Sequence, residues 1–320
     1  MRNFVSVLAF SVLGLLSACG GGGGGGTQGV GAFFQSAVYQ AAQVKTYGNV
    51  EYSRRPNANG EQYTSDSRKA QEIGTDELTL TMNVWVPPNA TGTTPMPLVV
   101  FIHGGGYNGG DKDEDYIVGD AVSYARSGFV TASINYRLTP DNTTSAERRQ
   151  TAIVQGAEDA MDAIRYLKKN ASTYHIDASR VAIVGTSAGG GLALAIAVEA
   201  DTLGGTAPYP PYAGISSKVQ AVVTTGATLI DQYTDNTGLL TYEAGDAPVL
   251  LFHANPTDST TGATWSGNVL PTCAAINGGG GSCTPVAQAN MTHTASMNLF
   301  DKWWGTIQPF LWTQLLLANV

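Results

Sequence analysis

The stretch that decides the fold is Gly185-Thr186-Ser187-Ala188-Gly189-Gly190-Gly191, which lies between the apolar residues 181–184 and 192–198. This order predicts a strand, a tight turn centred on Ser187, and a helix. The central residue of such a turn has strained backbone geometry, so the positions two before and two after it need minimal side chains, and both are glycine. The helix would direct free N–H groups and its positive dipole end at charge forming near the serine hydroxyl. The arrangement suits nucleophilic attack on a carbonyl.

A second glycine motif, His103-Gly104-Gly105-Gly106-Tyr107, directly follows the apolar residues 98–102. The Gly-x-Ser-x-Gly pattern alone is a modest signal in a chain with 39 glycines, and a glycine-rich turn is its plain alternative. Two glycine motifs, each behind an apolar strand, are much more specific than either one.

These motifs resemble those of the α/β-hydrolase superfamily, and within it the hormone-sensitive-lipase-like carboxylesterases. Three further stretches carry the resemblance, in family order: Tyr136-Arg137-Leu138-Thr139-Pro140, Glu158-Asp159-Ala160 and Ile176-Asp177-Ala178-Ser179-Arg180. The resemblance covers residues 75–200 and departs at Thr186, where the family commonly has aspartate. That departure leaves the serine in place and removes a neighbouring charge. The resemblance implies an α/β-hydrolase fold.

Apolar runs and helical periodicity alternate along the chain, which independently predicts an α/β fold with a mostly parallel central sheet and helices on both faces. The predicted strands are residues 48–54, 78–86, 98–102, 130–135, 181–184, 219–225, 249–252 and 286–289. The clearest predicted helices are residues 117–126 and 146–169. Without a linker-like stretch after residue 50, the chain predicts one catalytic domain, residues 47–320.

Residues 1–18 are predicted to be a signal peptide, because Arg2 precedes the apolar residues 4–16, which are too few to span a bilayer. A plain signal peptide or a buried helix is the alternative to an anchor. The position of Cys19 after Leu16-Ser17-Ala18 resembles the lipobox of bacterial lipoproteins, which implies a multiply acylated cysteine and a membrane partner.

The segment after this cysteine opens with an uninterrupted glycine tract, residues 20–26, which predicts a tether. Residues 19–46 are therefore interpreted as the anchor, the tether and an N-terminal segment. No aspartate follows Cys19, which resembles lipoproteins sorted to the outer membrane. The chain is thus expected to be an exported bacterial lipoprotein of the outer membrane, at the cell surface or the periplasmic face.

Cys273 and Cys283 are predicted to pair as a disulfide in an oxidising compartment. Two cysteines without a nearby histidine do not make a zinc site, and no metal or other cofactor is implied. The formal net charge is −8, with 13% of residues charged, which argues against nucleic acid or an anionic membrane as a partner.

A serine nucleophile needs a base, and the chain offers four histidines. In the family His103 is a structural residue under the glycine loop and the position of His253 is also structural, while His175 looks like a loop residue. His293 follows the last predicted strand, where the α/β-hydrolase order of serine, acid and histidine expects the base. A surface histidine is the alternative.

Asp258 is predicted to be the acid, because it follows the strand 249–252 and is the one carboxylate in residues 247–300. Its loop is one residue longer than the family pattern His-Gly-x-x-Asp. Asp231, after the preceding strand, is the alternative acid. The family resemblance also implies the oxyanion-hole donors, which map to the backbone N–H groups of Gly105, Gly106 and Ala188.

The predicted function is a carboxylic ester hydrolase that forms an acyl-enzyme on Ser187, with a small-molecule or polymer-linked ester as substrate. Alternatives are a feruloyl, acetyl-xylan or polyester esterase, a peptidase or acyltransferase of the same fold, and a silent binding domain. Residues 226–248 are too few for a large cap, which predicts an open cleft, although residues 30–67 could cover it. Oligomeric state is not indicated.

Overall fold

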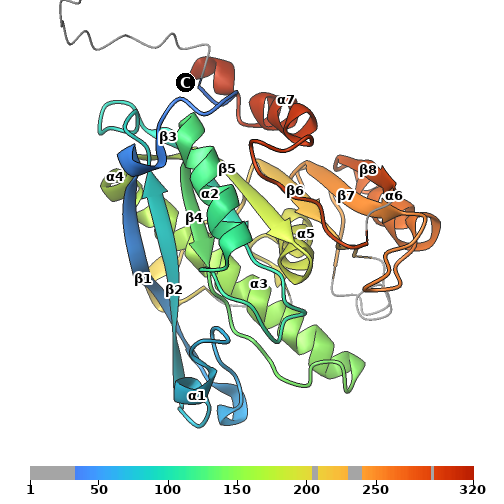
Figure 1. The fold of residues 1–320 in the computed structure, drawn as a ribbon. Helices are drawn as coiled ribbons and strands as arrows, with labels where there is room; N and C mark the ends of the chain where they lie inside the picture. Colours follow the sequence, from blue (N-terminus) through green and yellow to red (C-terminus); the bar gives the residue numbers. More distant parts are fainter. Residues whose placement is uncertain (1–32, 204–207, 230–239, 290–291) are drawn as a thin grey trace, which may run out of the picture.

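The computed structural model describes residues 33–203, 208–229, 240–289 and 292–320, and these form one eight-stranded sheet in the order β1-β2-β4-β3-β5-β6-β7-β8. The pairs β1–β2 and β2–β4 are antiparallel, and the other neighbouring strands are parallel. Helices cover both faces (Figure 1). The predicted fold class is therefore confirmed. The predicted signal peptide, Cys19 and the glycine tract lie outside the described residues.

Every predicted strand is present, most of them longer than predicted. The strands are β1 Lys45–Pro56, β2 Glu77–Val86, β3 Met96–Ile102, β4 Val130–Ile134, β5 Ile176–Thr186, β6 Ala221–Thr225, β7 Val249–Asn255 and β8 Cys283–Ala289. The helices are α1 Lys69–Glu72, α2 Asp115–Ser127, α3 Ala146–Lys169, α4 Ala171–Tyr174, α5 Ala188–Glu199, α6 Leu270–Gly278 and α7 Trp304–Gln314. Helix α3 has the predicted bounds.

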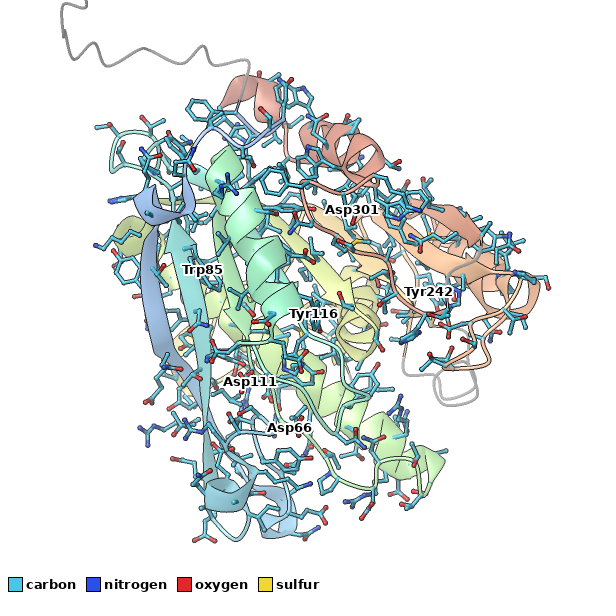
Figure 2. All side chains as sticks on the ribbon, viewed as in Figure 1. Asp66, Trp85, Asp111, Tyr116, Tyr242 and Asp301 are labelled. Carbon is cyan, nitrogen blue, oxygen red and sulfur yellow. A yellow bond between two sulfur atoms is a disulfide. The ribbon has the colours of Figure 1, made fainter. Side chains whose placement is uncertain are left out.

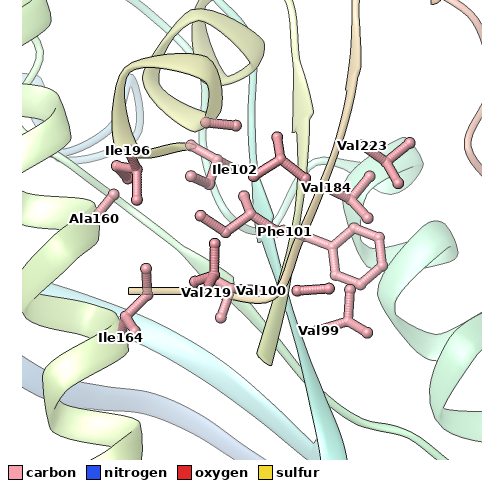
Figure 3. Close-up of a cluster of buried hydrophobic side chains, with 14 of the residues drawn as sticks. Val99, Val100, Phe101, Ile102, Ala160, Ile164, Val184, Ile196, Val219 and Val223 are labelled. Atoms are coloured by element: carbon pink, nitrogen blue, oxygen red, sulfur yellow. The ribbon is translucent and has the colours of Figure 1, made fainter. Parts of the chain in front are cut away.

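The centre of the sheet is buried on both faces, which explains why β3 is apolar without alternation. Figure 3 shows Val100 and Ile102 pointing toward α3 and α5, while Val99 and Phe101 point to the opposite side. There the Phe101 ring meets Tyr124 of α2 edge-on, with the ring centroids 5.2 Å apart. Packing on both faces of the sheet fixes the positions of the strands that end at the candidate site.

A buried ion pair joins two of the stretches that carry the family resemblance. Arg137 Nε donates to Asp159 Oδ2 at 2.9 Å, and the Arg137 backbone N–H donates to the same oxygen at 2.8 Å. Arg137 also pairs with Glu158. Removing one partner would leave a buried charge with fewer partners, which is destabilising. The pair therefore fastens the segment after β4 to α3.

The packed domain begins earlier than the predicted boundary at residue 47. Phe34 is buried, and its ring lies 4.7 Å from that of Phe129. The N–H of Phe34 also donates to the carbonyl of Ser127 at 2.8 Å. Hydrophobic contact at the end of α2 thus packs the chain onto the domain about a dozen residues before β1. No periodicity in the local sequence predicts this contact.

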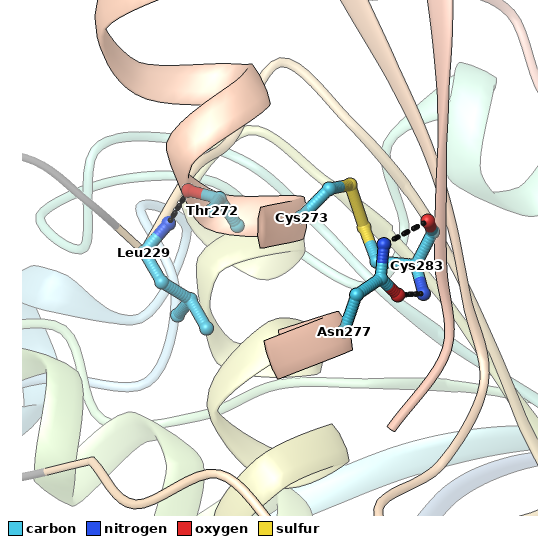
Figure 4. Close-up of a disulfide and its surroundings, with 5 residues drawn as sticks. All are labelled: Leu229, Thr272, Cys273, Asn277 and Cys283. Atoms are coloured by element: carbon cyan, nitrogen blue, oxygen red, sulfur yellow. Dashed lines mark hydrogen bonds between the residues drawn. A yellow bond between two sulfur atoms is a disulfide. The ribbon is translucent and has the colours of Figure 1, made fainter. Parts of the chain in front are cut away.

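The predicted disulfide is present between Cys273 of α6 and Cys283 of β8, with the Cα atoms 4.9 Å apart (Figure 4). The Asn277 side chain makes two further hydrogen bonds to the backbone of Cys283, at 2.7 and 3.2 Å. Helix α6 is thereby fixed to the strand that precedes His293. Within the described ranges, no helix combines the length and apolarity needed to cross a membrane.

Candidate active site

Ser187 occupies the turn between β5 and α5 with backbone angles φ 54° and ψ −118°, a strained conformation for a residue with a Cβ. The flanking glycines are needed for steric reasons. A Cβ on Gly185 would lie 2.4 Å from the carbonyl oxygen of Gly189, and one on Gly189 would lie 2.2 Å from that of Ile102. The Ser187 N–H donates to the carbonyl of Thr225 at 2.8 Å, which holds the turn against β6.

The structure brings together the serine, histidine and aspartate singled out in the sequence. Ser187 Oγ lies 2.7 Å from His293 Nε2, and His293 Nδ1 lies 2.6 Å from Asp258 Oδ2. The three residues follow β5, β8 and β7, whose carboxyl ends meet at one edge of the sheet. With Nδ1 protonated toward the carboxylate, Nε2 is free to accept the serine proton.

Asp258 is completely buried yet ionised. Its Oδ1 accepts the N–H groups of Thr260 at 2.8 Å and Thr261 at 3.0 Å. Burial alone would raise the pKa of the Asp258 carboxyl, but hydrogen bonds from His293, Thr261 and Thr260 outweigh it and leave the pKa below its ordinary value. Its negative charge is therefore available to stabilise a positive imidazole.

The other three histidines have structural surroundings. His103 is buried, stacks on Tyr136 and has its pKa lowered to about 4 by burial. Nε2 of His253 lies 3.7 Å from Asp258 Oδ2, but burial lowers the pKa of this imidazole, so it stays neutral and does not compete for the carboxylate. His175 lies beside Met96, at the opposite edge of the sheet.

The three expected oxyanion donors, Gly105, Gly106 and Ala188, all line the cleft beside Ser187. Within the described residues their N–H groups have no hydrogen-bond acceptor. Gly105 and Gly106 have φ values of 106° and 61°, and a Cβ on Gly105 would lie 2.0 Å from the carbonyl oxygen of Gly109. Glycine is required here by backbone conformation and close packing, not only by access for a substrate.

The loop carbonyls are held so that the N–H groups have fixed directions. The Gly104 carbonyl lies 2.7 Å from His103 Nδ1 and accepts from the Tyr136 hydroxyl at 3.3 Å, while the Gly105 carbonyl accepts from the Asn108 N–H at 3.0 Å. Because each carbonyl shares a rigid peptide plane with the next N–H, these bonds orient the N–H groups of Gly105 and Gly106.

Two further side chains hold this loop, and sequence reasoning missed both. Asn142 Nδ2 donates to the Gly106 carbonyl at 2.9 Å, and Arg149 Nη1 donates to it at 2.7 Å. The Arg149 guanidinium also lies over the Tyr107 ring, 4.3 Å from its centroid. Asn142 and Arg149 sit in a polar stretch with no motif of its own, so only the fold reveals their role.

Replacing Tyr136 with phenylalanine is expected to lower kcat about tenfold with little change in KM, because one hydrogen bond orienting the oxyanion loop is lost while the volume is kept. Tyr136 is buried, and its hydroxyl also donates to the His103 carbonyl at 3.0 Å. Tyr174→Phe is the matched control, since among the described residues the hydroxyl of that buried tyrosine bonds only to Tyr166, away from the cleft. Equal losses in both variants would argue against a positioning role.

Two cavities meet at Ser187 and His293. The larger, of about 610 Å³, includes Gly105, Gly106 and Arg149, and the smaller, of about 370 Å³, includes Glu114, Tyr116 and Asp120. None of the described residues in 33–67 lines either cavity. That segment instead supports the glycine loop from behind, where Asp66 accepts the Gly110 N–H at 2.9 Å.

Asp120 is predicted to make stability depend on pH. Burial raises its pKa to about 7, and hydrogen bonds from Asn298 and Met297 only partly oppose this. A carboxyl whose pKa is raised on folding stabilises the fold fully below its unfolded pKa of about 4, and this contribution is lost as the pH rises through 7. Asp120→Asn should therefore flatten the fall in unfolding free energy between pH 4 and 8, by on the order of 3 kcal/mol. Urea titrations at both pH values measure it.

The exposed Asp115, on the same helix, provides the control substitution for this experiment. Asp115→Asn should leave the pH dependence of the unfolding free energy unchanged. An Asp120→Asn variant with the same pH slope as the parent protein would show that this carboxyl is already ionised in the folded state at pH 5.

Comparison with known proteins identifies relatives among esterases. The BD-FAE family model matches residues 82–258, more than half of the chain. Carboxylesterase NlhH of Mycobacterium tuberculosis is 33% identical over 134 residues, which cover 42% of this chain and 38% of that protein. Ethyl acetate hydrolase of Pseudomonas putida is 32% identical over 123 residues, covering 38% of this chain and 35% of that protein. The chain thus spans less than two fifths of the length of these curated relatives.

Solved structures share the fold. A thermophilic esterase from Thermogutta terrifontis, Est2, superposes with a TM-score of 0.59 at 18% identity, covering 73% of this chain and 88% of that one. The same esterase phosphorylated by paraoxon gives a TM-score of 0.60 at 17% identity, covering 86% of this chain and 95% of that one. At these identities the likeness establishes the α/β-hydrolase fold.

Proposed function

Since the chain belongs to the BD-FAE family, we propose that it is a carboxylic ester hydrolase that works through an acyl-enzyme on Ser187. The single observation that carries the proposal is the continuous contact from Ser187 Oγ through His293 to the buried Asp258 carboxylate, at 2.7 and 2.6 Å. The esterase names of the matched relatives support the same reaction class.

In the proposed reaction His293 Nε2 takes the proton of Ser187 as Oγ attacks the ester carbonyl carbon. The negative oxygen that forms would accept N–H groups of Gly105, Gly106 and Ala188, each worth about 3 kcal/mol in related chemistry. His293 then returns the proton to the leaving alcohol. Water, activated by the same imidazole, hydrolyses the acyl-enzyme and restores Ser187.

The lining of the larger cavity favours small or polar substrates. Its described residues are glycine, alanine, serine, threonine, asparagine, arginine, histidine and the aromatic Tyr107, with no leucine, isoleucine, valine, methionine, phenylalanine or tryptophan. A long acyl chain would gain little from such walls, because its affinity depends on burial against apolar surface. Short-chain esters, such as acetyl groups on a polysaccharide, fit the cavity better than long-chain lipids.

The test is covalent labelling with a fluorophosphonate followed by rates on p-nitrophenyl esters of rising chain length, methyl ferulate and acetylated xylan. We expect labelling at Ser187 and the highest kcat/KM for acyl chains of about two to four carbons. A protein that labels but cleaves only peptide amides would be a peptidase. One that neither labels nor cleaves would be a silent binding domain.

We also propose that the protein is an exported lipoprotein anchored through Cys19. The lipobox-like sequence supports this, as does the Cys273–Cys283 pairing, since disulfides persist in oxidising compartments. Metabolic labelling with a fatty-acid analogue should mark the parent protein and not the Cys19→Ala variant. Labelling that survives this substitution would place the lipid elsewhere.

A further inference from the structure

Aromatic and aliphatic side chains gather where the chain enters the domain and where it ends. We call this surface the apolar end, and it consists of Phe33, Tyr39, Phe300, Trp304, Trp312 and Leu316. Phe300 and Leu316 are 62% and 59% exposed, which is unusual for such large apolar side chains. Figure 1 shows the first described residues beside α7 and the C-terminus.

Specific contacts hold several of these side chains on one surface. The Trp304 indole Nε1 donates to the carbonyl of Gln35 at 2.7 Å. The Phe33 and Tyr39 rings lie 6.0 Å apart, and Arg126 Nε donates to the Tyr39 carbonyl at 2.9 Å. The guanidinium of Arg126 in turn lies 4.9 Å from the centroid of the Phe300 ring. The first described residues, the end of α2 and α7 therefore form one face.

An apolar groove of about 370 Å³ opens on the same face. Phe33 and Met96 line one part of it, and Trp312, Leu317 and Val320 line another. The groove is large enough to take part of an acyl chain. Because exposed apolar surface is unfavourable in water, the face gains stability from any partner that removes it from solvent.

The groove of the apolar end lies at the opposite edge of the sheet from the active site. Met96 opens β3, whereas Ser187 follows the carboxyl end of the parallel neighbour β5. A seven-residue strand such as β3 separates the two edges by about 20 Å. Figure 2 labels Asp301, which follows Phe300, and Tyr116, which lines the smaller active-site cavity near the start of α2.

We propose that the apolar end docks on the lipid bilayer that holds the predicted Cys19 anchor. Cys19 precedes Phe33 by about 14 residues, a chain that reaches at most about 50 Å, so the anchor is attached to the domain at this face. Tryptophan and tyrosine favour the membrane interface, and the cation of the exposed Lys302 can extend toward lipid headgroups. This inference rests on the proposed anchor and is independent of the ester chemistry.

Docking in this way fixes the orientation of the active site relative to the bilayer. The active-site cleft at the carboxyl edge of the sheet would face away from the lipid, toward soluble or polymeric esters. In this orientation the lipids of the bilayer would not reach the cleft. The orientation agrees with a cavity whose described lining offers no large aliphatic side chain.

The test uses the full chain on phosphatidylcholine vesicles that carry brominated acyl chains, which quench nearby tryptophan fluorescence. Quenching is expected in the parent protein and should be reduced in Trp312→Phe. Trp265, whose N–H donates to the Pro256 carbonyl in the loop beyond β7, reports on the opposite edge, and Trp265→Phe should leave quenching unchanged. Quenching lost in Trp265→Phe alone would mean that the cleft faces the bilayer and would overturn the proposal.

A second measurement separates docking of the apolar end from anchoring through Cys19. In the Cys19→Ala background, Phe300→Ser and Leu316→Ser should each lower vesicle partitioning about fivefold, because each removes an exposed apolar side chain. Hydrolysis of a soluble ester should be unchanged. Unchanged partitioning, or loss of a dimer in sedimentation on either substitution, would show that the face does not serve the lipid.

Discussion

Substitution of Ser187 by alanine is expected to lower kcat by about five to six orders of magnitude, the largest effect of any single change in this chain. The expected loss is large because the hydroxyl, 2.7 Å from His293 Nε2, would be the atom that bonds to the acyl carbon. Any residual rate would come from substrate binding and the oxyanion donors alone. Steady-state hydrolysis of p-nitrophenyl acetate, with active-site titration of the parent protein, measures the difference.

Ser296→Ala is the matched control for this loss. Ser296 lines the smaller cavity beside the same imidazole, so its replacement changes a neighbouring hydroxyl without touching the contact between Ser187 and His293. It should keep kcat within about threefold of the parent. Activity of Ser187→Ala above about one per cent would exclude Ser187 as the nucleophile.

The sequence was sufficient for the parts of this site that depend on local backbone geometry. The turn at Ser187 needs Gly185 and Gly189 on either side, so its conformation is visible in the order of residues. The position of His293 follows from strand order, because parallel strands deliver their carboxyl ends to one edge. These features require no knowledge of distant contacts.

The remaining parts arise from contacts between segments far apart in the chain. Asn142 and Arg149 reach the Gly106 carbonyl because the segment after β4 and the start of α3 fold over the glycine loop. The raised pKa of Asp120 comes from burial in the folded chain, which the sequence of its own helix does not indicate. The early packing of Phe34 likewise depends on the end of α2. No pattern in the sequence connects the residues that make these contacts.

The identity of the acid is the assignment that a second substitution tests most sharply. Asp258→Asn is expected to lower kcat by about 10⁴, because asparagine keeps the shape but favours the wrong imidazole tautomer. The buried carboxylate accepts from His293 Nδ1 and from the N–H groups of Thr260 and Thr261, so the variant also loses a charge that the site is built to hold. The rate loss should appear in kcat, with binding of short esters nearly unchanged.

Asp231→Asn is the informative counterpart, since Asp231 follows β6, from which some α/β-hydrolases supply their acid. Asp231 lies outside the described residues, so the two variants, shown to be folded by circular dichroism, must decide between the residues. Because His293 Nδ1 already has the Asp258 carboxylate at 2.6 Å, a second acid would have no proton to accept there, and Asp231→Asn should cost less than about tenfold. If Asp231→Asn lowered kcat by orders of magnitude and Asp258→Asn kept the parent kcat, the imidazole would have to turn toward β6 during the reaction.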